Sequence, residues 1–393
     1  MRLSLEQAVY PWGTRRVVRL GDIEHDAGRQ HEIFFDIPGE TRLSIPEVLD
    51  GFVMGVIFYA MRIGEDIQVA GALSQDALCN LHDFQECWQS WRPNVYRRVT
   101  ISAGRILGSM RTPETPRAIS AFSGGVDSSF TLVRHRALLS ADGAHPLDSV
   151  MMVHGFDIPL DQPGTFDALV ARVRPLLDAY GVQLRIVRTN LRFLDLQDWE
   201  DSHIAQVAAC LHNFSPEFSY GLVAGAKSYP ELHIPYGCNP VTDPMLAGAG
   251  MRLVHDGAGF SRTEKAALLA RFPLARSSLK VCWEGADGSR NCGVCEKCVR
   301  TQLNFLAAGF SRPECFDRPL DENLIKTLTF LGEGQYRELT GIAAFAAKHG
   351  LHGRWLTLLR RRLAAHRLRT PLDAYWYAEF KLRRGLAKLR RLT

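Results

Sequence analysis

The sequence lacks any apolar segment long enough to cross a membrane, and it contains no repeat and no low-complexity stretch. Its longest apolar run, residues 52–61, is interrupted by Gly55, whereas a membrane helix needs about 20 apolar residues. The first residues, MRLSLEQAVYPWG, lack the apolar core of a signal peptide. Transmembrane, repeat and collagen-like classes are therefore excluded, and we expect a cytoplasmic protein.

The charge is not of one sign along the chain. Residues 351–393 hold 12 Lys/Arg and 2 Asp/Glu, a net charge of +10. The whole chain carries only +5, so the first 350 residues sum to −5. A mildly acidic body with a basic tail differs from a uniformly basic nucleic-acid-binding protein.

Cysteine is too unevenly spread for a disulfide framework. The chain has 9 cysteines, an odd number, and four of them lie close together at Cys282, Cys292, Cys295 and Cys298. One dense cluster and an odd total favour a metal site over paired disulfides.

The order of predicted elements indicates an α/β protein. Residues 1–112 are expected to be a mixed α+β region that binds substrate or a partner, with strands at HEIFFDI and at 52–61 and a helix over SQDALCNLHDFQECWQSW. RTPETPR, with two prolines and no apolar residue, is the predicted boundary. Residues 311–393 are expected to be helical. Between them, strands separated by helices predict a parallel sheet covered on both faces; these strands are 118–122, 149–156, 184–190 and 220–226.

The sharpest motif lies between the first of these strands and its helix. It comprises Ser123, Gly124, Gly125, Val126, Asp127 and Ser128. Two glycines allow a tight turn whose N–H groups converge, and the following helix adds its positive end, so a phosphate is favoured there. Ser123 and Ser128 can donate hydroxyl hydrogen bonds, and Asp127 can cap the helix or help to hold Mg²⁺. The plain alternative is a glycine turn with a capped helix.

A second stretch, GLVAGAKS at 221–228, nearly matches the phosphate-binding loop of kinase-like enzymes. Ala226 replaces the glycine that this loop needs before its lysine, and the stretch has the composition of a strand. Transfer of a γ-phosphate is therefore disfavoured.

The Ser123–Ser128 loop resembles the SGGxDS loop of the PP-loop ATP pyrophosphatases. The resemblance implies that ATP is the substrate and is split into AMP and pyrophosphate, with an adenylated intermediate. A loop of this kind would hold the departing pyrophosphate and stabilise its growing charge.

The four clustered cysteines predict a structural zinc site. The spacing C-x9-C-x2-C-x2-C lets four thiolates surround one tetrahedral Zn²⁺ and leaves no open position for catalysis. An iron–sulfur cluster and a pair of redox cysteines are the alternatives.

Together the two motifs are similar to those of the 7-cyano-7-deazaguanine synthases, PP-loop enzymes of queuosine-precursor synthesis, over about residues 117–310. Lys265, Cys282-Trp283 and the CGVCEKC segment stand at matching positions. The segment from Gly237-Cys238-Asn239-Pro240 to Asp243 is similar to the part of that family near its substrate. The resemblance implies a ligase that adenylates a 7-deazaguanine-type heterocyclic acid and forms an amide or a nitrile with a nitrogen nucleophile. The resemblance also implies that Lys265 contacts ATP or pyrophosphate.

Two of the family's acceptor-site segments are absent. HGFD at 154–157 and KSYP at 227–230 stand in their places. The chain is therefore expected to be a divergent paralogue whose amine acceptor is larger than ammonia, such as a protein, an RNA or a polymer precursor. His154 and Asp157 lie at the carboxyl end of the second parallel strand, where such sheets bind ligands, so they are candidate nucleotide or substrate contacts; strand capping is the other interpretation.

Three questions stay open at this level. The basic tail, with apolar residues at helical spacing, either packs on its own domain or docks RNA, an acidic partner or a membrane surface. A sulfur-transfer enzyme acting on RNA, with Cys210 and Cys238 as candidate thiols, and a non-catalytic nucleotide-binding subunit are alternative functions. The oligomeric state is open, with a homodimer as one option.

Overall fold

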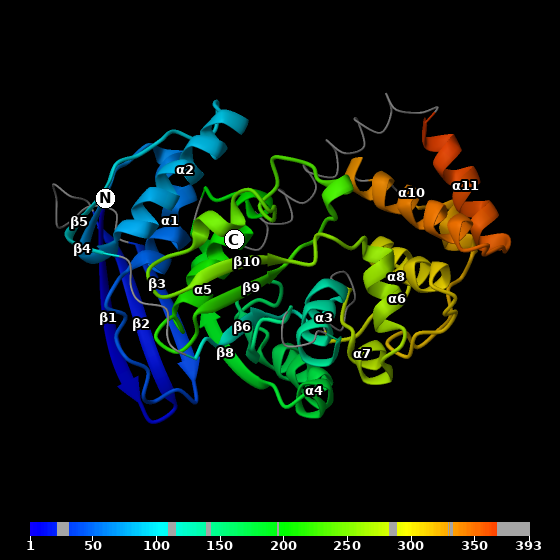
Figure 1. Cartoon of the computed structure of the whole chain (residues 1–393), viewed down its shortest axis with the longest axis horizontal. Helices are drawn as coiled ribbons and strands as arrows, with labels where there is room; N and C mark the ends of the chain where they lie inside the picture. The colour runs from blue at the N-terminus through cyan, green and yellow to red at the C-terminus, as the bar shows by residue number, and fades with distance from the viewer. Residues whose placement is uncertain are drawn as a thin grey trace.

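The computed structural model describes residues 1–21, 31–108, 115–138, 143–194, 196–282, 289–328, 330 and 333–367 (Figure 1). The strands form one ten-stranded sheet in the order β10-β9-β6-β7-β8-β3-β2-β1-β4-β5. The N-terminal strands lie at one end of the molecule and helices α10 and α11 at the other, with the parallel strands between them (Figure 1). The expected α/β class is confirmed. Among the described residues no helix has the length and apolar character to span a bilayer.

The N-terminal region has the expected mixed α+β character. Its elements are β1 (Arg2–Tyr10), β2 (Gly13–Gly21), β3 (His31–Pro38), α1 (Asp50–Ile63), β4 (Ile67–Ser74), α2 (Gln75–Trp91) and β5 (Ile101–Leu107). The strand predicted at HEIFFDI and the helix at SQDALCNLHDFQECWQSW are confirmed. The strand predicted over 52–61 is wrong, because this run lies inside α1. Every residue of α1 from Asp50 to Met61 is buried, and a helix buried all round shows no periodicity that separates it from a buried strand.

The predicted parallel strands are all present. They are β6 (Ala118–Ala121), β7 (Leu147–His154), β8 (Gln183–Thr189) and β9 (Tyr220–Ala224), joined by α3 (Val126–Val133), α4 (Pro163–Ala179) and α5 (Trp199–His212). One more strand, β10 (Arg252–Asp256), pairs with β9 at the sheet edge and was not predicted. Apolar cores lie on both faces, one including α1 and α5 and the other α3 and α4. The order reverses between β6 and β9, which makes the carboxyl ends of these two strands the place where such sheets bind ligands.

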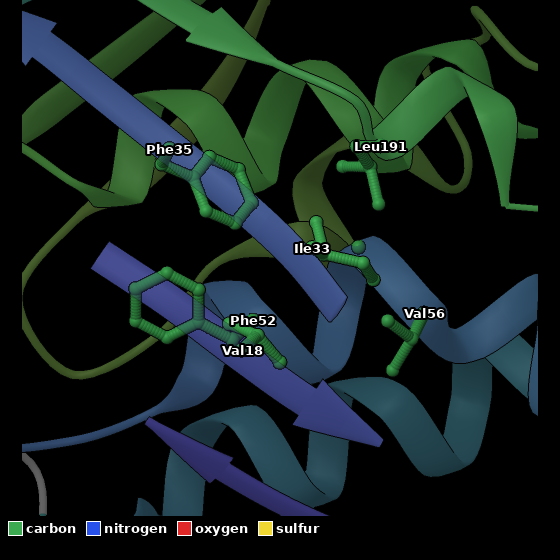
Figure 2. Close-up of a pocket in the computed structure, with 7 residues that line it drawn as sticks. Val18, Ile33, Phe35, Phe52, Val56 and Leu191 are labelled. Atoms are coloured by element: carbon green, nitrogen blue, oxygen red, sulfur yellow. The ribbon is translucent and has the colours of Figure 1, made fainter. Parts of the chain in front are cut away.

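The N-terminal region continues the sheet and shares its core. β3 pairs antiparallel with β8, Phe35 opposite Thr189 and Asp36 opposite Arg188. Figure 2 shows where the two parts meet, with side chains from both turned toward one another; these are Val18, Ile33, Phe35, Phe52, Val56 and Leu191. The gap between them has no room for a water molecule. The predicted boundary at 111–117 thus separates two segments of sequence that share one core.

Helix α1 crosses α5 at glycines. A Cβ atom at Gly55 would come within 2.9 Å of Ala209 Cβ and 3.3 Å of Leu191 Cδ2. The small size of glycine at this crossing therefore allows the two helices to approach closely.

The matched pair Gly55→Ala and Gly164→Ala tests this packing. Gly55→Ala should lower the free energy of unfolding by about 1–3 kcal/mol, because an added methyl overfills a close-packed contact. Gly164 lies in the first turn of α4 and an added Cβ would meet nothing within 4 Å. Its replacement should be neutral or stabilise by up to about 1 kcal/mol. Urea denaturation measures both, and a Gly55→Ala protein as stable as the wild type would contradict the proposed close contact.

The last part of the described chain is mostly helical. It contains α6 (Arg262–Leu269), α7 (Pro273–Ser278), α8 (Glu296–Ala307), α9 (Asn323–Lys326), α10 (Glu333–Lys348) and α11 (Arg354–Arg367). Residues 311–322 form no helix, so the expectation of helix throughout from 311 is wrong there. Trp355, Leu359 and Leu363 of α11 are buried in a core that includes Leu339 and Ile342 of α10. The beginning of the basic tail thus packs on its own chain, while residues 368–393 lie outside the described ranges.

Candidate phosphate site and metal centre

The Ser123–Ser128 loop connects β6 to α3 at the point where the strand order reverses. Gly124 has φ +73°, a left-handed conformation that favours glycine. Gly125 is the N-cap residue, and no side chain caps the helix there. The first N–H groups of α3 are therefore left for another acceptor, and an anion is the ligand that such a helix end favours.

The two serines of the loop lie close together, Ser123 exposed and Ser128 buried. Ser128 Oγ is 3.3 Å from the Ser123 backbone nitrogen and 3.4 Å from Ser123 Oγ, and the Gly125 N–H donates to Ser123 Oγ. These long hydrogen bonds hold two hydroxyl groups beside the helix end, where both can be redirected to phosphate oxygens. The residue types that the sequence singled out are thus brought together.

Asp127 does not cap α3 but forms ion pairs with two cations from α6. Arg262 Nη1 lies 2.9 Å from Asp127 Oδ2, and Lys265 Nζ lies 3.2 Å from Oδ1. Lys265 is almost fully buried and also donates to the Gly225 carbonyl at 2.5 Å, which fixes its ammonium group beside the end of β9. Burial alone would raise the pKa of the Asp127 carboxyl, but the charges of Arg262 and Lys265 outweigh burial and lower that pKa.

Local sequence explains how α6 presents these cations. Ser261 and Glu264 form a capping box that starts the helix at Arg262. Residues three apart share a helix face, so Arg262 and Lys265 point to the same carboxylate. The sequence analysis identified Lys265 and missed Arg262, although this i,i+3 spacing could have indicated it.

A carboxylate from α10 completes the charged cluster, and sequence analysis missed it too. Glu338 is buried, forms an ion pair with Arg300 of α8, and lies 3.6 Å from Arg262 and 4.0 Å from Lys227. Burial raises the pKa of Glu338, whereas these three cations outweigh burial and lower it. Helix α10 therefore reaches the cations around the glycine loop through Glu338.

His154 is the last residue of β7 and Asp157 lies three residues beyond it, and neither forms a hydrogen bond or an ion pair with the described residues of the loop. His154 Nε2 is 2.8 Å from the Pro159 carbonyl, and its ring stacks on Phe166. Burial lowers the pKa of His154. The Asp157 side chain is 78% exposed and lies 3.9 Å from Arg192. The hydrogen bond to Pro159 is what the strand-capping interpretation expects of His154, and nucleotide contacts of His154 and Asp157 both stay predictions.

The competing stretch at 221–228 begins as a strand. Residues 221–224 belong to β9, which pairs with both β6 and β10. This agrees with its composition and leaves the Ser123–Ser128 loop as the phosphate-binding candidate. Cys210 and Cys238, the thiols named for sulfur transfer, are both buried.

The four clustered cysteines fit a tetrahedral metal site. Cys282 Sγ lies 3.8 Å from Cys295 Sγ, and Cys292 Sγ lies 3.9 Å from Cys298 Sγ. The four sulfurs lie within 4.8 Å of one another. Zinc–sulfur bonds of about 2.3 Å at tetrahedral angles place sulfurs about 3.8 Å apart. The cluster can therefore hold a metal ion such as zinc without large rearrangement.

The local backbone positions these thiols. Gly293, with φ +75°, makes the turn between Cys292 and Cys295, and the Cys295 N–H donates to Cys292 Sγ at 3.3 Å. Asn291 Oδ1 accepts the N–H groups of Val281 and Cys282, which brings the first cysteine to the other three.

The metal centre and the glycine loop are joined through one short segment. The Lys280 N–H donates to the Gly124 carbonyl at 2.8 Å, two residues before Cys282. A metal that fixes Cys282 would therefore also restrain the glycine loop.

The structure is that of an α/β protein with a mostly parallel sheet, a glycine loop where the strand order reverses, and a four-cysteine cluster that can hold a metal ion. Comparisons of the chain with protein-family models, with curated proteins and with solved structures find no match.

Proposed function

We propose that this protein is an ATP-dependent ligase of the PP-loop type, which splits ATP into AMP and pyrophosphate. The observation that carries the proposal is the Ser123–Ser128 loop, which combines an uncapped helix end with two hydroxyl groups where the strand order reverses. The buried Lys265 and Arg262 place positive charge beside this loop. The arrangement suits a pyrophosphate group that gains charge as it leaves.

In the proposed reaction a carboxylate oxygen of the substrate attacks the α-phosphorus of ATP. The bond between the α-phosphorus and the bridging oxygen breaks, and pyrophosphate leaves with the electron pair. A nitrogen nucleophile then attacks the acyl adenylate and displaces AMP, which yields an amide. A carboxylate is already ionised near pH 7, so the first step needs positioning and charge stabilisation and no general base.

The substrate in this proposal is a 7-deazaguanine-type acid, by resemblance to the 7-cyano-7-deazaguanine synthases. A nitrile, the other product that the resemblance implies, would need a second step: the amide oxygen would attack another ATP with release of pyrophosphate, and loss of AMP carrying that oxygen, together with the two amide protons, would leave the nitrile. The acceptor we propose is an amine on a larger partner, a protein, an RNA or a polymer precursor, which the N-terminal region or the basic tail would dock. Mg²⁺ would accompany ATP, and zinc would occupy the four-cysteine centre as a structural ion.

Analysis of the nucleotide products tests this proposal directly. With the full chain, Mg-ATP, a panel of heterocyclic acids and ammonia or amines, AMP and pyrophosphate should form together. Ser123→Ala should lower AMP formation about a hundredfold, the scale of losing one donor that stabilises a transition state. Ser102→Ala in the edge strand β5 is the matched control and should leave the rate unchanged. ADP and inorganic phosphate as the main products would overturn the proposal.

A further inference from the structure

A second group of side chains that can ligate a metal ion is separate from the four-cysteine cluster. Cys238 and Asp243 belong to the segment that follows β9, and His255 lies in β10. One donor atom from each lies within 4.8 Å of the other two. All three side chains are buried, with 3% of the His255 side chain exposed and none of Asp243.

The polar contacts of the group converge on one nitrogen. His255 Nδ1 lies 2.7 Å from Asp243 Oδ2 and 4.0 Å from Cys238 Sγ. The other ring nitrogen, Nε2, is buried and has no hydrogen-bond partner among the described residues. It faces Gly225, where an added Cβ would lie 2.6 Å from it. The ring is therefore oriented through Nδ1, toward the thiol and the carboxylate.

The separations are close to those that a tetrahedral ion would impose. Ligand bonds of about 2.3 Å for sulfur and about 2.1 Å for nitrogen and oxygen give about 3.6 Å between sulfur and nitrogen and about 3.4 Å between nitrogen and oxygen. The nitrogen–sulfur distance of 4.0 Å and the nitrogen–oxygen distance of 2.7 Å would each have to change by less than about 1 Å. The ion would replace the proton that Nδ1 shares with Asp243.

A network around Asn239 already holds the Asp243 carboxylate in position. The Asn239 N–H donates to Asp243 Oδ1 at 3.1 Å, which leaves Oδ2 for His255. The Asn239 side chain donates to the Tyr236 carbonyl and to Thr242 Oγ1, and accepts the N–H groups of Val241 and Thr242. Outer hydrogen bonds of this kind orient carboxylate ligands in metal sites.

We propose that Cys238, Asp243 and His255 bind a second metal ion, of the zinc class. Thiolate and imidazole donors favour zinc and its neighbours over magnesium and calcium, which prefer oxygen ligands alone. Three protein ligands leave a fourth position for water or a nitrogen or oxygen ligand, which distinguishes this site from the closed four-cysteine centre. Gly225 lies between the group and Lys265, since its carbonyl accepts from Lys265 Nζ. The ion would thus lie beside the candidate phosphate site.

Metal content of the full chain tests this inference, and ATP chemistry plays no part in the measurement. Protein purified from zinc-supplemented cells should contain two zinc ions per chain by elemental analysis. His255→Ala and Cys238→Ser should each retain one. The control Cys79→Ser, which changes an exposed cysteine of α2, should retain two.

X-ray absorption at the zinc edge decides the outcome even if a variant fails to fold. Wild-type protein with both sites filled should show an average of about 2.5 sulfur ligands per zinc, because one site offers four and the other one. A single zinc per chain with four sulfur ligands, unchanged in Cys238→Ser, would overturn the inference. The group would then be a buried Asp–His hydrogen bond with a packed cysteine beside it.

Discussion

Replacement of Lys265 by Met should lower AMP formation by about 10²–10³-fold while the protein stays folded. The ammonium is the buried cation that joins Asp127 of the glycine loop to the Gly225 carbonyl at the end of β9. Its loss would remove a charge directed at the proposed pyrophosphate, and one preorganised donor contributes on this scale. Met has nearly the same volume and keeps the apolar part of the side chain in place.

The variant should also lose some stability. The Gly225 carbonyl would lose its donor, which costs about 1–3 kcal/mol when the group is buried. Arg262 would still pair with Asp127, so the carboxylate would not be left alone. Lys348→Met, at the exposed end of α10, is the matched control. Assays of AMP release measure the effect on the rate, and thermal melting measures the effect on stability. An unchanged rate of AMP formation in a folded Lys265→Met protein would show that Lys265 does not act in the proposed site.

Replacement of Cys295 by Ser should remove one zinc ion per chain and destabilise the region around the glycine loop. Zinc bound by four thiolates contributes about 10–16 kcal/mol of apparent binding energy in small domains, so local folding depends on it. Cys295 lies at the start of α8, and the metal would tie this helix to Cys282. Because Lys280 donates to Gly124, the loss should reach the loop.

Three measurements test this prediction. Elemental analysis reports the loss of zinc, proteolysis of residues 279–300 reports the local destabilisation, and AMP release reports the effect on the glycine loop. Cys79→Ser is again the control, since its thiol is exposed on α2. Iron with visible charge-transfer absorption in the wild type would show that the cluster holds an iron–sulfur group. Unchanged metal content in the Cys295→Ser protein would contradict the four-cysteine assignment.

Structural features formed by a single contiguous segment of the chain were predictable from the sequence. The serines and glycines of the glycine loop lie within six residues of sequence. Three of the four clustered cysteines lie within seven residues of a second segment. Alternation of apolar strands with helices predicted β6 to β9. In each case backbone geometry over a few residues determines the arrangement, so one segment carries enough information.

Features that depend on distant segments were missed. Arg262 and Glu338 meet near Asp127 only because α6 and α10 pack on the same side of the sheet end as α3. The prediction that His154 lies at the carboxyl end of a parallel strand is confirmed, since it is the last residue of β7, but the sequence could not indicate its hydrogen bond to Pro159. The short strand β10 has charged or polar residues at three of five positions, and too few apolar residues to be recognised as a strand.

The packing of α1 on α5 has a consequence for the parallel-strand region. In an open parallel sheet the outer side of a covering helix normally faces water and is polar. Here Ala209 and His212 of α5 lie against Gly55 and Gly51 of α1, and both are buried. Without the N-terminal region, the face of α5 around Ala209 would be exposed to water. The parallel-strand region is therefore expected to depend on the N-terminal region for its solubility and stability.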